Sequence, residues 1–113
     1  MGDCIFCKIG QGELPAKLIY QDADIFAFED AAPQAPTHIL ICPRTHIVSL
    51  SEATAGDAAL LGRLQLVAAQ VAHERGITSG YRTVINNGKG AGQSVFHLHV
   101  HLLAGREFRW PPG

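Results

Sequence analysis

The segment HLHVH at positions 97–101 constrains the fold of this chain more than any other stretch. Residues two apart in a β-strand share one face and lie about 6.6 Å apart along the strand. If the run VFHLHVHLL (95–103) forms a strand, its three histidines point one way while the leucines and valine between them face the core. Packing does not explain three imidazoles on one face, so we interpret this face as a chemical site.

Other short runs rich in Ile, Leu and aromatic residues predict further strands. These runs cover residues 17–20, 25–28, 38–42 and 81–86. The prolines of APQAP (32–36) fix backbone angles and remove N–H donors, so this stretch is predicted to be a loop between two strands. The loop leads directly to His38 at the start of the third strand.

One long helix is predicted from Thr54 to Arg75, where apolar residues recur at helical spacing. Thr54 and Asp57 resemble a capping box, and Gly76 suits the left-handed turn that often ends a helix. A chain of 113 residues with 47% hydrophobic content has room for one modest core. We therefore expect a single domain over residues 1–113.

The composition excludes several classes of partner. Nine Lys and Arg against ten Asp and Glu give a net charge of -1, so no broad field attracts a nucleic-acid polymer or an anionic membrane. No apolar run approaches the roughly 20 residues of a membrane span. Three cysteines, an odd number, fit a reducing compartment better than a disulfide framework, so we expect a cytoplasmic protein.

Two chemistries remain open for the histidine face. Zinc binds imidazoles in a tetrahedron, but the outer two histidines of a straight strand lie about 13 Å apart, so one metal held by all three would require a bend. Phosphate binding is favoured by the loop NGKGAGQS (87–94), whose glycines allow backbone N–H groups to converge on an anion. Such a loop is also an ordinary hairpin connection. Beside an anion, Ser94 and neutral imidazoles would supply donors and a nucleophile.

The run from His97 to Leu103 resembles the signature of the histidine triad (HIT) family, and the similarity extends over nearly the whole chain. The matching segments are IFCKI, PAK, FEDAAPQAPTHIL, GYRTVINNG, GQSVFHLHVHLLAG and WPPG. Together they are most similar to the Hint branch of nucleotide-binding phosphoramidases. The resemblance implies an α+β fold with a five-stranded antiparallel sheet, one long helix and one short helix. It also implies a homodimer in which the two sheets form one continuous ten-stranded sheet.

The activity implied by the resemblance is hydrolysis of the P–N bond in purine nucleoside phosphoramidates through a nucleotidyl-histidine intermediate. By motif position, His99 is the nucleophile, His101 and His38 flank the α-phosphate, and Ser94 serves the leaving nitrogen. The nucleotide-binding positions implied are Asp30 for the ribose, Asn86, Gly92 and Gln93 for the phosphate loop, Phe6, Ile9, Phe28 and Leu40 for the purine slot, and Val95. Ala31 replaces a branched aliphatic that relatives often carry, which would loosen the base pocket.

A structural zinc site is a further prediction. The motif CIFC places Cys4 and Cys7 at metal-ligand spacing, and two thiolates with two imidazoles make a closed tetrahedral site. The resemblance to bacterial HIT proteins implies His46 and His97 as the other two ligands, with no cofactor needed for catalysis. The alternative is that both cysteines are free thiols and His46 is a surface residue.

The C-terminal segment REFRWPPG carries the only tryptophan of the chain. Its prolines favour an extended form, and the resemblance implies that Trp110 reaches the partner's active site and influences leaving-group specificity. Packing of Trp110 on its own subunit is the alternative. Two rival functions also remain open: hydrolysis of dinucleoside polyphosphates, and a zinc-stabilised nucleotide-binding module without catalysis. No motif identifies the physiological leaving group.

Overall fold

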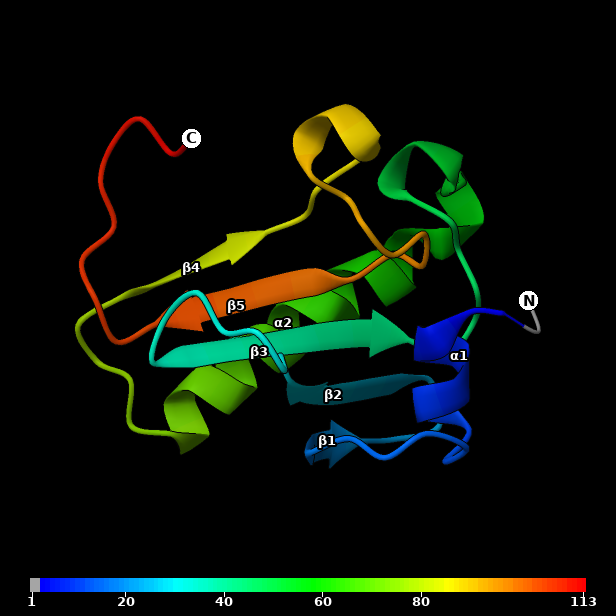
Figure 1. Cartoon of the computed structure of the whole chain (residues 1–113), viewed down its shortest axis with the longest axis horizontal. Coiled ribbons are helices and arrows are strands. Elements are labelled where there is room, and N and C mark those ends of the chain that lie inside the picture. The colour runs from blue at the N-terminus through cyan, green and yellow to red at the C-terminus, as the bar shows by residue number, and fades with distance from the viewer. Residues whose placement is uncertain (1–2) are drawn as a thin grey trace.

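A five-stranded antiparallel sheet, with strand order β1-β2-β3-β5-β4, forms the centre of the computed structural model, which describes residues 3–113 (Figure 1). Its helices and strands are α1 (Ile5–Gly10), β1 (Leu18–Gln21), β2 (Ile25–Glu29), β3 (Thr37–Pro43), α2 (Ala58–Glu74), β4 (Tyr81–Val84) and β5 (Val100–Ala104). Single 3-10 turns occupy Leu50–Glu52, Ala55–Asp57 and Lys89–Ala91. The predicted α+β class, with one long and one short helix, is confirmed.

The two faces of the sheet bury different kinds of side chain. Alternate residues of β2, β3 and β5 pack with the apolar stripe of α2, which crosses behind the sheet in Figure 1. The opposite face carries a smaller aromatic core in which Phe6 of α1 packs edge-on against Phe28 of β2, which in turn stacks on Phe26. The second face is covered only in part, because α1 is six residues long. This partial cover leaves room for a site.

The last strand is shorter than predicted. Residues 95–99 are irregular and β5 begins at Val100, so of the three triad histidines only His101 lies in the strand. The reason is that the backbone of residue 98 bonds outside the sheet: the N–H of Leu98 donates to the carbonyl of Ile47, in the segment after β3, at 2.6 Å. The alternation nevertheless persists, because Leu98 packs in the α2 core on the side opposite the histidines.

The long helix and the strand before the glycine loop also differ slightly from prediction. Regular α-helix starts at Ala58, after a 3-10 turn at whose start Thr54 N–H donates to the Asp57 carboxylate at 2.9 Å. Gly76 has the expected left-handed backbone, with φ of 71°. β4 ends at Val84 rather than at residue 86. Among residues 3–113, none of the helices combines the length and apolar character that a membrane crossing requires.

Candidate active site and metal-ligand cluster

His99 has one ring nitrogen committed to the backbone. Its Nδ1 lies 2.7 Å from the carbonyl oxygen of His97, which can only accept a hydrogen bond, so Nδ1 carries the proton. The neutral ring then has a free lone pair on Nε2. Burial, the largest cause, lowers the pKa of His99 below its ordinary value, so that the ring stays neutral. This is the state in which an imidazole acts as a nucleophile.

His38 and His101 form a hydrogen-bonded pair beside His99, and the direction of the hydrogen bond between them is fixed. The N–H of Gln34 donates to His38 Nδ1 at 3.0 Å, so the proton of neutral His38 resides on Nε2. That Nε2 lies 2.9 Å from His101 Nδ1, which therefore accepts and leaves the His101 proton on its own Nε2. The ring centroids of His99 and His101 are 4.9 Å apart. A chain of fixed tautomers thus runs from a loop N–H to a donor beside the nucleophile.

Burial keeps these two imidazoles neutral as well. It lowers the pKa of His38, although the nearby Asp30 carboxylate opposes this effect. The pKa of His101 falls to about 4, mainly because of burial and then because of His99 and His38. Asp30 Oδ2 lies 3.3 Å from His38 Nε2, and Asp30 Oδ1 accepts from the N–H of Ala32 at 2.8 Å.

A hollow of about 280 Å³ opens over His99 and His101. Its lining combines apolar walls with polar groups from two loops and β5: Ile5, Phe6, Ile9, Phe28, Asp30, Ala31, Leu40, Ser94, Val95, His99 and His101. A second hollow of about 340 Å³ adjoins it and shares Ile9, Phe28, Asp30 and Ala31. The structure therefore brings the purine-slot, ribose and catalytic positions implied by the sequence to one place.

The glycine-rich loop does not form the open cradle of N–H groups expected from its sequence. It folds as a 3-10 turn in which the N–H groups of residues 91–93 bond to the carbonyls of Gly88 and Lys89. Among the hydrogen bonds found within residues 3–113, none involves the N–H or the hydroxyl of Ser94, which lines the hollow. Ser94 thus offers two free donors, its N–H and its hydroxyl, at the edge of the hollow.

Gln93 holds the loop together rather than facing the hollow. Its side chain is 4% exposed and accepts from Gly88 N–H at 2.7 Å. The same side chain donates to the carbonyls of Val48 and Val95. Its polar atoms are therefore occupied, and Gln93 influences a ligand only through the loop shape. Asn86 lies beside Gly92, outside the residues that line the hollow.

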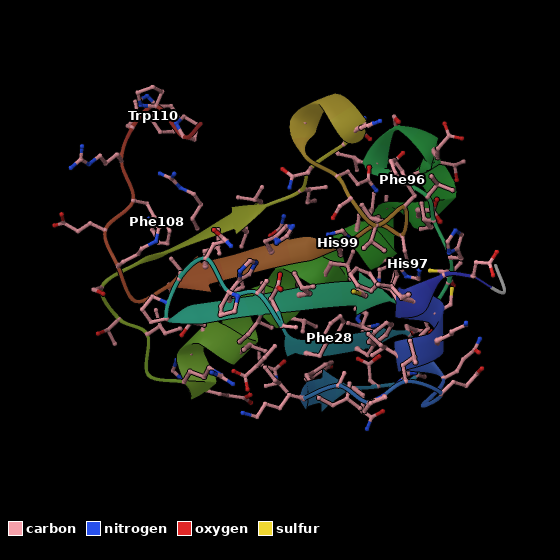
Figure 2. The ribbon with its side chains drawn as sticks, viewed as in Figure 1. Phe28, Phe96, His97, His99, Phe108 and Trp110 are labelled. Carbon is pink, nitrogen blue, oxygen red and sulfur yellow. The ribbon has the colours of Figure 1, made fainter. Side chains whose placement is uncertain are left out.

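A second cluster lies where the start of α1 meets the segment after β3 and the 95–99 segment, and Figure 2 shows His97 there beside α1. The ligand-type atoms of Cys4, Cys7, His46 and His97 all lie within 4.8 Å of one another. His97 Nδ1 is 3.3 Å from Cys4 Sγ and 3.5 Å from Cys7 Sγ. His46 Nδ1 is 3.4 Å from Cys7 Sγ and 3.2 Å from His97 Nδ1.

These residues fit a tetrahedral zinc ion. Bonds of 2.0 to 2.3 Å give donor-to-donor edges of about 3.3 to 3.8 Å in a tetrahedron, close to the observed spacings. His97 Nε2 donates to the carbonyl of Pro43 at 2.8 Å, which leaves the lone pair of Nδ1 directed at the sulfurs. Burial and then Cys4 raise the pKa of the Cys7 thiol, so a bound cation would favour its deprotonated form. Cys42, the third free cysteine, is buried in the aromatic core and outside the cluster.

The C-terminal tail is anchored to its own subunit, but its tryptophan is not. Arg82 donates to the carbonyl of Arg109 at 2.9 Å, and the guanidinium groups of Arg82 and Arg106 lie over the ring of Phe108. Trp110 is 83% exposed and points away from the rest of the protein in Figure 2. Within the described chain the expected cover for Trp110 is therefore absent, and the alternative of packing on its own subunit is not realised.

Three contributions to the site were missed by sequence reasoning. They are the carbonyl of Pro43, the N–H of Gln34, and Arg106, whose Nε donates to the carbonyl of Gln34 at 3.1 Å. The first two are backbone groups. Every residue type supplies a carbonyl, and every type except proline supplies an N–H, so the residue type does not reveal them.

Comparison with known proteins supports one family. A model described as "HIT domain" matches residues 11–108. The chain is 54% identical, over 98% of its length and 97% of the relative's, to an uncharacterized HIT-like protein of Synechococcus elongatus.

Solved structures agree with this match. A HIT family hydrolase from Legionella pneumophila superposes with a TM-score of 0.95 and 46% identity, covering 98% of this chain and all of that one. A Zn-bound histidine triad family protein from Mycobacterium smegmatis has a TM-score of 0.81 and 33% identity, covering 99% and 85% of the two chains.

Proposed function

Because this chain belongs to the HIT domain family, we propose that it is a hydrolase that cleaves the P–N bond of purine nucleoside phosphoramidates through a covalent intermediate on His99. The observation that carries the proposal is the bond from His99 Nδ1 to the carbonyl of His97. This bond orients the ring and reserves the Nε2 lone pair for attack on phosphorus. Residues 1–113 act in this proposal as one HIT domain.

The first step forms a bond between His99 Nε2 and the α-phosphorus and breaks the bond from phosphorus to the leaving nitrogen. The leaving amine requires a proton, and the Ser94 hydroxyl, free within the loop, is placed to deliver it. His101 Nε2–H donates to the phosphate oxygens on which charge develops. In the second step water attacks phosphorus and returns a proton to the Ser94 oxygen, the bond from phosphorus to His99 Nε2 breaks, and the nucleoside monophosphate leaves His99 in its neutral form.

The two adjoining hollows supply the nucleoside site. Asp30 lines both of them, and a carboxylate there can accept hydrogen bonds from both ribose hydroxyls. Phe6, Phe28 and Leu40 offer apolar walls to a flat base. Ala31 also lines both hollows, and its small side chain leaves the base end open, so we expect adenosine and guanosine substrates to be accepted alike.

We also propose that Cys4, Cys7, His46 and His97 hold a structural zinc ion, as their donor spacings allow. When bound, the ion would supply no catalytic chemistry, because four protein ligands close its coordination. It would tie α1 to the segment after β3 and to residue 97. Since Phe6 of α1 packs edge-on against both His97 and His99, this tie would stiffen one wall of the active site.

The test is turnover of adenosine 5'-monophosphoramidate and a panel of alkyl and aminoacyl adenosine phosphoramidates, with acid quenching and mass spectrometry to find AMP bound to His99. We expect steady turnover and a trapped adduct in the wild type. Faster turnover of dinucleoside polyphosphates would favour that rival activity. Binding of AMP with no turnover of either class would favour a non-catalytic nucleotide-binding module.

A further inference from the structure

The active site contains a second cluster of metal-ligand type. Atoms of Asp30, His38 and His101 also lie within 4.8 Å of one another. His38 Nε2 is 2.9 Å from His101 Nδ1 and 3.3 Å from Asp30 Oδ2. By spacing alone, two imidazoles and a carboxylate make an acceptable site for a divalent metal.

The two clusters differ in which ring nitrogen is free. A neutral imidazole binds a metal only through the nitrogen that lacks a proton. In the cysteine cluster, the carbonyl of Pro43 accepts a hydrogen bond from His97 Nε2, which therefore carries the proton. The lone pair of Nδ1 is then free to bind a cation. In the active site, the N–H of Gln34 occupies Nδ1 of His38, so the proton is forced onto Nε2, the atom that faces His101 and Asp30.

A metal on His38 Nε2 would therefore require the His38 proton to move to Nδ1. There it would face the N–H of Gln34 at a distance of 3.0 Å, with two donors opposed and the hydrogen bond lost. The hydrogen bond from the Gln34 N–H thus disfavours metal binding at His38 Nε2. The same bond favours the His38 tautomer that donates a proton from Nε2.

The Gln34 N–H lies in an exposed loop that Asp30 and the Gln34 side chain brace from within and that Arg106 braces from the chain after β5. Arg106 Nε donates to the carbonyl of Gln34 at 3.1 Å, and the Arg106 guanidinium stacks over the ring of Phe108, 4.4 Å from its centroid. Next to it, Gly105 lies against Pro36 so closely that a Cβ would come within 2.8 Å of the proline ring. The chain after β5 therefore holds both ends of this stretch of the loop.

We propose that Arg106 is a positioning residue that holds the Gln34 N–H against His38 Nδ1. In this position the cluster of Asp30, His38 and His101 acts as a proton relay and does not bind divalent metals. The relay half of this statement rests on the proposed function. The metal half does not, because it concerns which nitrogen of His38 carries a proton.

The direct test is the tautomer of His38 in zinc-loaded wild-type protein, read from two-bond couplings in proton–nitrogen NMR spectra. We expect the Nε2–H tautomer in the wild type and a mixture of both tautomers in Arg106→Ala. Arg106→Lys retains the charge but not the planar stack on Phe108, so it should restore the wild-type spectrum only in part. A His38 that is Nδ1–H in the wild type, or a spectrum unchanged in Arg106→Ala, would overturn the proposal.

The second test removes the N–H itself. Gln34→Pro lacks the donor, whereas Gln34→Ala keeps it and loses only the side-chain bond to the carbonyl of Ala32. Calorimetric titration with zinc chloride, after the cysteine cluster is filled, should show a second ion bound at least about tenfold more tightly by Gln34→Pro and Arg106→Ala than by the wild type or Gln34→Ala. Equal second-site affinity in all four proteins would disprove the metal half.

Neither measurement requires turnover. If no phosphoramidate were hydrolysed, the proposed function would fail while both tests of Arg106 still gave an answer. If Gln34→Pro does not fold, Arg106→Ala and the wild-type spectrum decide the matter.

Discussion

The cysteine–histidine cluster and the active-site histidines lie on one face of the sheet and share Phe6 as a neighbour, yet their imidazoles are prepared for opposite tasks. The ring of Phe6 lies edge-on to both His97 and His99, with ring centroids 6.0 Å and 5.0 Å apart, respectively. In the first cluster a backbone carbonyl fixes the proton on the remote nitrogen and frees the lone pair for a cation. In the second, a backbone N–H on His38 does the reverse. The difference shows that the backbone group behind an imidazole sets its chemistry.

His97 belongs to both regions. Its ring lies with the sulfurs of Cys4 and Cys7, and its carbonyl fixes the tautomer of His99. The ring of His97 is completely buried, so neither contact is open to water. A disturbance of the cysteine cluster should therefore reach the nucleophile through one residue.

The largest effect should come from removing the nucleophile. His99→Asn is expected to lower kcat about a thousandfold or more, since the covalent route is lost, while AMP affinity and zinc content stay near wild type. Initial rates, calorimetry and elemental analysis measure the three quantities. Near-normal turnover in this variant would show that the chemistry is not centred on His99.

Breaking the other cluster should affect stability first. Cys4→Ser with Cys7→Ser should abolish zinc binding and cost about 2 kcal/mol, which lowers Tm by roughly 10 °C in a domain of this size. Activity should fall less than in His99→Asn. Cys42→Ala is the matched control, because this buried cysteine lies outside the cluster and zinc should remain bound. Zinc retained by the double variant would contradict the assignment.

Acid should lower the stability of the folded protein, because the pKa of His101 is about 4 in the fold and 6.5 for a free side chain. Between these pH values the unfolded chain binds a proton that the folded chain does not, so the free energy of unfolding falls as pH decreases from 6.5 to 4. Above pH 6.5 the effect vanishes. Its full size is about 3 kcal/mol.

Urea unfolding across this pH range measures the effect, and His101→Asn should show a shallower pH dependence. The exposed His73, on α2, provides a control in His73→Asn. Identical pH dependence in wild type and His101→Asn would contradict the burial argument.

The smallest effect is expected from the tail, which touches neither cluster of its own chain. We propose that Trp110 meets the leaving group in the active site of a second protomer, because its indole is exposed here and a large aromatic gains free energy when covered. Deleting residues 109–113 should change the ranking of leaving groups a few-fold and leave AMP affinity unchanged. Substrate-panel kinetics and analytical ultracentrifugation test this. Equal slowing of all substrates, or a fully active monomer, would contradict it.

Much of the fold was open to prediction because it depends on local patterns. The five strands, the long helix and its capping residues follow from hydrophobic periodicity and turn chemistry, which neighbouring residues determine. The alternation in HLHVH placed Leu98 in the core correctly even though the strand starts only at Val100. The strand end was missed because it depends on a bond from Leu98 to the carbonyl of Ile47, which is distant in sequence.

The residue types and their spacing were enough to identify the side chains that could carry chemistry: imidazoles, two thiols at metal spacing, a hydroxyl after a glycine loop, and a carboxylate near a proline-rich turn. The task of each imidazole, in contrast, depends on the folded arrangement. The carbonyls of Pro43 and His97 and the N–H of Gln34 fix the proton positions of His97, His99 and His38. These groups are common to nearly all residues, so their effect comes from position, which long-range packing sets.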